Sequence, residues 1–464
     1  MSGSPAAKQN MGKPFEMNER TILVFWGIGM FLMTMNTTMF NVALPTVITE
    51  FQIPSSVATW IVSGYSVVFA LSAITFSRLS DYVPIRRLIS FGLLVLGISS
   101  LIGFFSNSFL FLLLARLFQA IGASALPSLA VVLFSKYIPV NRRGNAMAVV
   151  AASASLGFGM GPLFGGVLTE QWGWNYLFLV PFAVLVILPI IRRNLPSEAI
   201  QKVKFDVFGA ILIGVSVGGV LLFVTSGIYI ALIFSIPAMF LLWKHIHKAE
   251  IPFIQSELLH YRSYLLLLLM PFTSFFMNFA TLFTIPILLS ELFNKNPLET
   301  GLIIFPGAIL AAFSANLAGK VIDRKGPVNV IRAGLAFLFI AYILFAFFAN
   351  VSPYASLGII IIAISGSNIL LASANNEVSR ILPATFIGSG MGLIQLSQFV
   401  GGAFGAGVAG MLISVQQQLP QEEIFRNLFF VYIGWMIIAH IVFHLYLRSK
   451  KAGRNIAHDN SLSS

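Results

Sequence analysis

The chain has 464 residues, of which 57% are hydrophobic and only 9% are charged. Soluble domains carry about 25% charged residues, so this composition excludes a mainly water-exposed surface and indicates a polytopic membrane protein. The absence of cysteine from the sequence excludes disulfides and thiolate metal sites. The formal net charge of +12 is typical of proteins that bind nucleic acid, but the positions of the basic residues indicate membrane topology instead.

Fourteen mainly apolar runs are each long enough to cross a bilayer as a helix, which takes about 20 residues. In chain order they cover residues 21–46, 57–77, 88–106, 109–135, 144–168, 174–192, 206–226, 228–243, 263–288, 299–320, 328–349, 353–374, 386–414 and 427–447. Residues 1–20 are polar and lack an apolar region followed by a small-residue cleavage site, so we expect a cytoplasmic tail and not a signal peptide.

The 28 lysines and arginines follow the alternation of these runs. With a cytoplasmic N-terminus, 25 of them fall in cytoplasmic segments, two in outer loops (Lys295 and Arg426) and one, Arg116, inside a run. Such an excess on the cytoplasmic side is described by the positive-inside rule. The basic charge therefore predicts cytoplasmic termini and attraction to anionic lipid, and it argues against nucleic acid as a partner.

Two loops of similar sequence indicate an internal repeat. RLSDYVPIRRLISFG follows the second run and KVIDRKGPVNVIRAG follows the tenth. In each, an aspartate (Asp81, Asp323) precedes a glycine (Gly92, Gly334) by eleven residues, with basic residues between them. Two unrelated basic loops would also satisfy the positive-inside rule, but their matching places in the order of runs favour a duplicated bundle.

The repeat predicts an all-α membrane fold of two six-helix bundles and a central helix pair. We expect one bundle at residues 21–193, the other at 263–447, and a two-helix insert with cytoplasmic linkers at 194–262. Residues 1–20 and 448–464 would be cytoplasmic tails. Transporters built from repeated bundles commonly bind substrate between them.

Several motifs resemble those of the major facilitator superfamily. RLSDYVPIRR, ARLFQAIGASA (115–125) and GFGMGPLFGG (157–166) stand where that family has its loop motif, its helix-4 motif and its helix-5 antiporter motif. MNTTMFNVALP (35–45) and WGWNYLFLVP (172–181) resemble the fourteen-helix drug:proton antiporter branch, in particular Gram-positive tetracycline and multidrug exporters. The resemblance implies the major facilitator fold and export in exchange for protons.

The sequence departs from the tetracycline exporters of that branch at two positions. The resemblance places acidic residues at or near Thr37 and Phe158, and exporters of cationic drugs likewise tend to have an acid in helix 1. These departures argue against tetracycline–metal complexes or cations as substrates, and they leave the predicted fold unchanged.

A stripe of small residues runs along the fifth helix. Gly157, Gly161 and Gly165 recur every four residues, so on a helix they form one face that a second membrane helix can approach closely. Pro162 removes a backbone hydrogen bond and is expected to bend the helix. The stripe is either packing alone or, as the resemblance implies, a seam that resists leak and serves as a pivot in an alternating-access transporter.

Arg116 is the one basic residue deep within a run, where charge is costly and usually functional. Gln119 lies three residues further on and shares its helix face. The resemblance gives Arg116 a part in proton coupling, by setting the protonation of a nearby group or by ordering water. The alternative is a structural arginine bonded to backbone carbonyls.

The repeated loops and one further carboxylate complete the charged candidates. The resemblance implies a latch in which Asp81 and Arg87 on one half face Asp323 on the other, and the alternative is a solvated turn. Glu377 precedes Arg380 by three residues, so the two can pair along a helix. Either Glu377 faces the central cavity and carries the proton, or it belongs to a cytoplasmic helix end.

Uncharged polar side chains inside the apolar runs are candidates for substrate binding. They are Asn36, Asn41, Tyr65, Asn278, Asn368, Gln395 and Gln398. Buried amides need partners, so interhelical hydrogen bonds could account for each one separately. Spread over helices that line the central cavity in the family, they also suit a weakly polar site, for which phenylalanines such as Phe275 could supply aromatic walls.

The sequence predicts a transporter and not an enzyme, because it has no phosphate-binding glycine loop with lysine and no cluster with metal-ligand spacing. We expect a monomeric exporter of amphipathic organic compounds, such as drugs, in a bacterial cytoplasmic membrane, driven by protons and without a cofactor. The alternatives are an exporter or facilitator of an endogenous metabolite, lipid or siderophore on the same fold and, from another class, a channel or a structural membrane protein.

Overall fold

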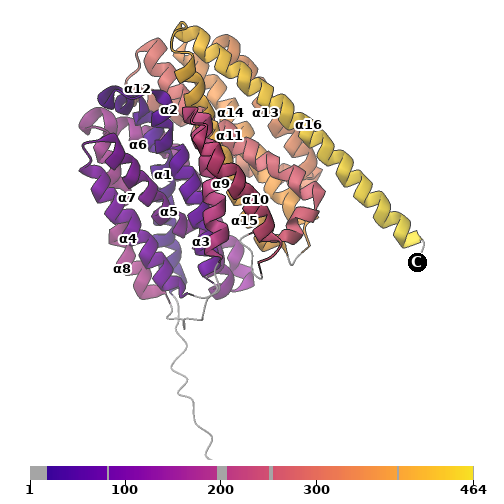
Figure 1. The fold of residues 1–464 in the computed structure, drawn as a ribbon. Coiled ribbons are helices and arrows are strands. Elements are labelled where there is room, and N and C mark those ends of the chain that lie inside the picture. Colours follow the sequence, from indigo (N-terminus) through magenta and orange to yellow (C-terminus); the bar gives the residue numbers. More distant parts are fainter. Residues whose placement is uncertain (1–17, 81–82, 196–205, 250–253, 384–385, 463–464) are drawn as a thin grey trace, which may run out of the picture.

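The computed structural model describes residues 18–80, 83–195, 206–249, 254–383 and 386–462, and within these ranges the regular structure is helical (Figure 1). Each of the fourteen predicted runs coincides with a helix or with a short series of helices. The first bundle consists of α1 (Glu19–Phe51), α2 (Ser55–Ala58), η1 (Thr59–Ile61), α3 (Ser63–Leu79), α4 (Ile85–Phe104), α5 (Phe109–Tyr137), α6 (Val140–Trp172), η2 (Trp174–Phe178), α7 (Leu179–Phe182) and α8 (Val184–Asn194).

The central pair and the second bundle follow. The pair is α9 (Val207–Ser226) and α10 (Ile230–Ile246). After η3 (Ser256–His260), the second bundle consists of α11 (Arg262–Phe293), α12 (Pro297–Lys325), α13 (Pro327–Phe348), α14 (Pro353–Ile381), α15 (Ile387–Val415) and α16 (Gln421–Leu462). By length and hydropathy, eleven helices of the described chain can cross a membrane. The other three predicted spans coincide with the shorter α10 and with α6 and α12, which have 33 and 29 residues.

Two of the predicted spans differ in form from a single regular helix. The second begins with the short α2 and η1 before α3, and the sixth is divided into η2, α7 and α8. Pro181 lies in the divided region and lacks the amide proton that a continuous helix would use there. The fourteenth helix, α16, is longer than the predicted 427–447 because it continues through the charged residues that follow the apolar run.

Equivalent helices of the two bundles make equivalent contacts. The first and fifth helices pack together in each bundle, α1 with α6 and α11 with α15. Across the molecule, the fifth helix of each bundle packs on the second helix of the other, α6 on α12 and α15 on α3. The two halves are therefore related by an approximate two-fold repeat.

The glycines of the repeated loop motif have matching roles in this repeat. A Cβ on Gly92 of α4 would lie 3.2 Å from the carbonyl oxygen of Gly122 in α5. A Cβ on Gly334 of α13 would lie 2.8 Å from the backbone nitrogen of Leu370 in α14. In each bundle this glycine lets the third helix approach the fourth at close range, which supports the internal repeat.

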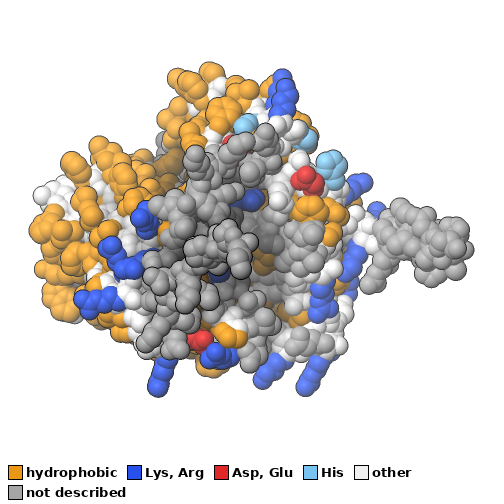
Figure 2. All heavy atoms as spheres, turned by 90° about the horizontal axis from the view of Figure 1, so that it is seen from below, with side chains coloured by type: hydrophobic (Ala, Val, Ile, Leu, Met, Phe, Trp, Pro, Cys, Tyr) orange, Lys and Arg blue, Asp and Glu red, His pale blue; other side chains and the backbone are white. Residues whose placement is uncertain are grey.

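The two ends of the molecule differ in charge. We call the end where α4 and α13 begin the basic face, and the other end the opposite face. The basic face carries exposed side chains such as Arg87, Arg193, Lys244 and Lys325. Figure 2 shows lysine and arginine side chains spread around this face, with hydrophobic side chains toward its outer edge. This distribution is expected of a helical bundle whose sides contact lipid.

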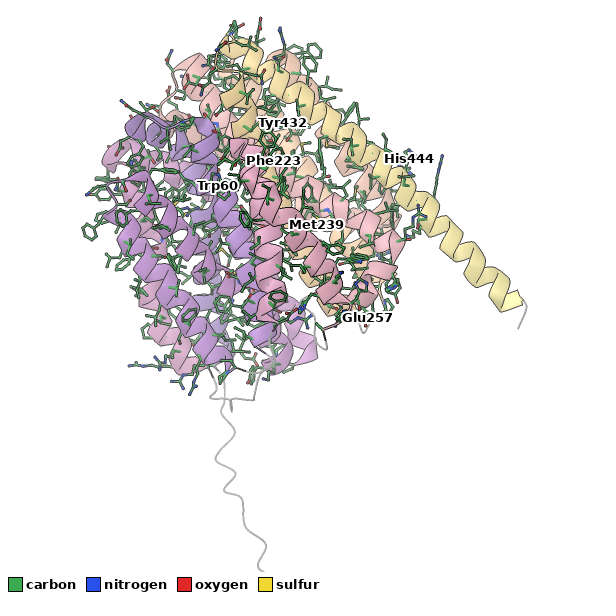
Figure 3. The ribbon with its side chains drawn as sticks, viewed as in Figure 1. Trp60, Phe223, Met239, Glu257, Tyr432 and His444 are labelled. Carbon is green, nitrogen blue, oxygen red and sulfur yellow. The ribbon has the colours of Figure 1, made fainter. Side chains whose placement is uncertain are left out.

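The central helix pair lies against the join between the bundles. α9 contacts α3 of the first bundle and α15 of the second. Val67, Leu221 and Ala403 form a small buried cluster there, with Trp60 packed against it. Figure 3 shows Trp60 and Phe223 on this side of the molecule and Met239 on the adjoining α10. The pair therefore touches both halves and leaves α10 mainly at the outer surface.

Candidate functional site

A cavity of about 340 Å³ lies between the two bundles, and we call it the central cavity. It is bounded by α1 and α6 of the first bundle and by α11 and α14 of the second. Its polar and aromatic lining residues are Thr38, Ser155, Phe158, Ser274, Phe275, Asn278, Phe279, Asn368 and Asn375. None of the described lining residues is charged. The cavity thus combines amide and hydroxyl groups with three phenylalanine rings.

The amide groups of this cavity come from the second bundle. Asn278 lies on α11, and Asn368 and Asn375 lie two turns apart on α14. Gln398 of α15 donates a hydrogen bond to the side chain of Asn375 at 3.4 Å, which links α15 to the cavity wall. Half-buried amides of this kind offer both donors and acceptors to a ligand.

Not all of the predicted substrate-binding residues line the cavity. Asn278 and Asn368 line it, and Gln398 lies behind Asn375. Asn41 is buried and donates to the carbonyl oxygen of Thr38 at 3.1 Å, while Gln395 is half-buried on α15 outside the lining set. The sequence predicts how deep each of these residues lies within its helical span, but it does not predict which way the side chain points.

Phe158 and Asn375 were missed as lining residues by the sequence analysis. Phe158, noted only as a departure from an acidic position, forms part of the cavity wall. The i, i+7 spacing of Asn368 and Asn375 on one helix face is the signal that could have identified Asn375.

Arg116 lies in the first bundle, in a buried cluster of its own. Its Nη1 donates to Asn36 Oδ1 at 3.1 Å and to Gln119 Oε1 at 2.9 Å, and Gln119 Nε2 donates to Ser100 Oγ at 2.7 Å. The guanidinium carbon is 4.2 Å from the ring centroids of both Phe40 and Tyr65. We call Arg116 and these side chains the Arg116 cluster.

Two residues that were predicted to bind substrate lie in the Arg116 cluster instead. Asn36 and Tyr65 contact Arg116 and do not belong to the described lining of the central cavity. Side-chain amides and aromatic faces, and not backbone carbonyls, are the described partners of the guanidinium. A charge buried in this way is stabilised by hydrogen bonds and by the electron-rich ring faces.

The glycine stripe of α6 lies against α1. A Cβ on Gly157 would meet Thr34 and lie 3.0 Å from the backbone nitrogen of Met35, and one on Gly165 would lie 2.9 Å from Met39 Cα. Gly161 similarly faces Met35 and Thr38, and Thr38 donates to the carbonyl oxygen of Phe158 at 3.4 Å. No side chain larger than hydrogen fits along this seam without a backbone shift.

The second bundle contains the equivalent seam. A Cβ on Gly401 of α15 would lie 3.0 Å from Phe272 Cα, and one on Gly405 would lie 2.9 Å from Phe276 Cα, both in α11. The glycines of GGAFGAGVAG (401–410) in the thirteenth helix therefore allow the same close packing as the stripe of the fifth helix. Pro162 lies within the continuous α6, and its carbonyl oxygen is approached by Gly301 of α12.

The bundles meet directly at the opposite face. A Cβ on Gly166 of α6 would lie 3.0 Å from Leu298 Cα of α12, and one on Gly410 of α15 would lie 2.9 Å from the carbonyl oxygen of Ser55 in α2. Beside the second contact, the backbone nitrogen of Ser56 donates to Ser414 Oγ at 2.9 Å. These paired contacts obey the approximate two-fold repeat and join the halves at one end of the central cavity.

The structure corrects the placement of Glu377. Its carboxylate does not line the central cavity; it accepts hydrogen bonds from Tyr446 and Lys450 of α16, which lie toward the basic face. The helix-end alternative therefore describes its position, and its ion pair is with Lys450 and not with Arg380. The physical reason is direction: Glu377 lies two residues after the lining residue Asn375, a rotation of roughly 200° around an α-helix, so its side chain faces α16 and not the cavity.

The structure describes only part of the predicted latch between the two halves. Asp81 and the side chain of Asp323 lie outside the described residues, and Arg87 is exposed on the basic face. Within the described chain, no group of three or more histidine, aspartate or glutamate side chains has the arrangement of a metal site.

Comparison with known proteins agrees with this architecture. Residues 26–406 match the family model described as Major Facilitator Superfamily. The chain is 26% identical over 413 residues to the riboflavin transporter RibZ of Clostridioides difficile, covering 88% of this chain and 90% of that protein. It is also 26% identical over 409 residues to the multidrug resistance protein Stp of Mycobacterium tuberculosis, covering 84% of this chain and 75% of that protein.

Solved structures show the same fold at low sequence identity. An inward-facing and occupied bacterial homolog of the human lysosomal transporter Spinster superposes with a TM-score of 0.69 at 15% identity, covering 94% of this chain and 98% of that chain. A POT family transporter in complex with 5-aminolevulinic acid gives a TM-score of 0.68 at 15% identity, covering 95% and 98%.

Proposed function

The chain belongs to the Major Facilitator Superfamily, a family of membrane transporters and not of enzymes, and on that premise we propose that it exports uncharged amphipathic compounds in exchange for protons. The observation that carries this proposal is the central cavity between the bundles, with amides on one side and phenylalanine rings around them. A flat, weakly polar organic molecule can stack on the rings and hydrogen-bond to the amides.

The uncharged lining sets the proposed substrate class. A cation or anion entering a cavity without a countercharge would lose its hydration with no ionic partner to replace it. Neutral molecules avoid that cost, and the amides of Asn278 and Asn368 can orient them. We therefore propose neutral drugs or antibiotics, in keeping with the absence of acids at Thr37 and Phe158.

Alternating access is the proposed mechanism. The halves join at the opposite face through Gly166 and Gly410, so release of substrate there requires these contacts to open. The glycine seams within each bundle allow α1 with α6, and α11 with α15, to move as close-packed pairs. This supports a carrier whose cavity is reached from one face at a time.

For proton exchange we propose a role for the Arg116 cluster. Among the described residues Arg116 Nε has no hydrogen-bond partner, so the guanidinium retains a donor for water or for a group that changes protonation. The basic face is proposed to be cytoplasmic by the positive-inside rule, and bacterial relatives support a bacterial cytoplasmic membrane. A monomer is sufficient for this mechanism because the cavity lies within one chain.

A second candidate is a transporter of an endogenous metabolite. The similarity to a riboflavin transporter over most of both chains favours a vitamin-like, flat heterocycle as one test compound. Such a molecule would use the same rings and amides, so the two proposals share one binding site. They differ in the substrate and in whether transport must be coupled to protons.

The decisive experiment is export from a pump-deficient bacterial host across a panel of neutral, cationic and anionic compounds that includes riboflavin. We expect neutral aromatic compounds to leave the cells and a proton uncoupler to stop their export. Export that persists with the uncoupler would support a facilitator, and ionic currents without saturation would support a channel. Asn278→Leu should reduce export, whereas Asn329→Leu, an exposed amide outside the cavity, should not.

A further inference from the structure

A second and larger cavity opens at the basic face, outside the proposed transport path. Its volume is about 1170 Å³, and α11, α12, α13, α14 and α16 of the second bundle contribute to its walls. Its charged lining residues are Arg262, Lys325, Arg380, Arg448, Lys450 and Glu377. Five basic side chains against one carboxylate give this basic-face cavity a formal charge of +4, in contrast to the uncharged central cavity.

The one carboxylate does not neutralise the other basic groups. Glu377 is already engaged by Tyr446 and Lys450 and is 1% exposed. Within the described residues, the guanidinium groups of Arg262, Arg380 and Arg448 form no ion pair. Three arginines thus surround one hollow without a carboxylate partner in the described chain, and arginine is the side chain best suited to binding phosphate oxygens.

The walls of this cavity are fixed by bonds between helices. Ser263 Oγ lies 2.9 Å from Ser449 Oγ and joins α11 to α16, while Glu377 joins α14 to α16. Tyr264 of α11 donates to the carbonyl oxygen of Gly390 in α15 at 2.8 Å. The helices that carry the basic groups are therefore joined around a formed space and do not need to assemble when a ligand arrives.

An apolar stripe on the outer surface leads to the same cavity. Ile437, Ile441 and Leu445 of α16 recur every four residues and are 49%, 55% and 42% exposed, and Leu445 itself lines the cavity. On a membrane helix such a stripe faces lipid chains. A ligand that fits both the apolar stripe and the basic-face cavity would have an acyl portion along the stripe and an anionic headgroup in the cavity.

We propose that the basic-face cavity binds the phosphate headgroup of an anionic phospholipid from the adjacent leaflet, with its acyl chains along α16. Basic pockets between membrane helices can bind such headgroups. Inorganic phosphate shares the recognising chemistry but has nothing to place on the apolar stripe, so the lipid is the source that both features fit. The site is separate from the central cavity and does not depend on which compound is transported.

The test uses the full chain in detergent and short-chain lipids detected by native mass spectrometry. We expect dihexanoyl-phosphatidylglycerol to bind and dihexanoyl-phosphatidylcholine to bind much more weakly. Arg262→Gln with Arg448→Gln should weaken binding of the anionic lipid about 25-fold, at roughly fivefold for each charge removed. The matched control is Arg192→Gln with Arg193→Gln, which removes two exposed charges from α8 and should leave binding unchanged.

Three outcomes would overturn the proposal. They are equal binding of the two lipids, equal loss in both double variants, and binding of inorganic phosphate as tight as that of the anionic lipid. If the first double variant does not fold, Arg448→Gln alone tests the same site, because this side chain is exposed and its loss removes no described ion pair.

Discussion

Arg116 Nη1 donates to Asn36 Oδ1 at 3.1 Å and thereby joins α5 to α1 inside the first bundle. The acidic residues of α1 stand only at its ends, Glu19 and Glu50, and the sequences of α3, α4 and α5 contain none. The guanidinium is therefore held by amides and ring faces where a carboxylate would be the usual partner. This makes Arg116 a buried charge whose described partners are all neutral.

Replacing Arg116 by alanine should abolish uphill export. The change leaves the acceptors Asn36 Oδ1 and Gln119 Oε1 without their donor, and each hydrogen bond to a charged group is worth about 1.5–3 kcal/mol. We expect downhill exchange to continue while accumulation against a gradient stops, measured in proteoliposomes with an imposed pH difference. Arg116→Lys is the charge-keeping control, and full uphill transport by Arg116→Ala would reduce the residue to a structural role.

The sequence predicted where residues lie along the helices better than which way they face. Hydropathy located all fourteen helical segments, and the i, i+3 spacing correctly brought Gln119 to Arg116 at 2.9 Å. Asn36 and Tyr65 were assigned to a substrate pocket because burial of a polar residue does not reveal the side of the helix on which it lies. Their contact with Arg116 depends on packing between α1, α3 and α5.

Contacts between residues far apart in the chain likewise could not be predicted from the sequence. Local spacing suggested Arg380 as the partner of Glu377, but the ion pair is with Lys450, which is 73 residues away on α16. The breaks in the sixth helix were also missed, since its apolar run of 174–192 is uninterrupted in hydropathy. Periodicity describes one helix at a time, whereas the ion pair between Glu377 and Lys450 depends on how α14 and α16 pack together.

Adding a methyl group to the glycine seam should impair both stability and export. In Gly165→Ala the new Cβ would lie 2.9 Å from Met39 Cα and closer still to the Met39 carbonyl oxygen, so α1 and α6 must separate. Overpacking of this kind costs about 1–3 kcal/mol. We expect a lower thermal transition and slower export, and a complete loss of export in Gly161→Leu although that protein still inserts.

The control for the seam is Gly358→Ala on α14, where a Cβ would meet nothing within 4 Å. This variant should keep the wild-type transition temperature and export rate. Equal effects of Gly165→Ala and Gly358→Ala would mean that the close approach of α1 and α6 has no special importance.

Joining the halves at the opposite face should stop transport reversibly. The chain has no cysteine, so Ser56→Cys with Ser414→Cys introduces one defined pair across the contact in which Ser56 N and Ser414 Oγ are 2.9 Å apart. We expect a short thiol cross-linker to block export, and a reductant to restore it when the link is cleavable. The measurement is export before and after cross-linking, with the extent of cross-linking checked by mass spectrometry.

A matched pair tests whether motion between the halves is the cause. Asn350→Cys with Glu422→Cys lies within the second bundle, where Asn350 Nδ2 donates to the carbonyl oxygen of Glu422 at 2.8 Å. Cross-linking this pair should leave export intact. Unimpaired export with the Ser56 and Ser414 positions fully linked would contradict alternating access through the opposite face.

Placing a carboxylate in the central cavity should change the charge of the compounds that are exported. Asn278→Asp keeps the size of the side chain but introduces a negative charge among lining residues that carry none in the described chain. A cation entering the cavity would then gain an ionic partner, whereas neutral compounds would lose one amide donor. We expect export of neutral compounds to fall and export of lipophilic cations to appear. The control Asn329→Asp places the same charge on the exposed start of α13 and should cause neither change. An unchanged preference in Asn278→Asp would show that the selective site lies elsewhere, because a new charge in a site of this size cannot be neutral to its ligands.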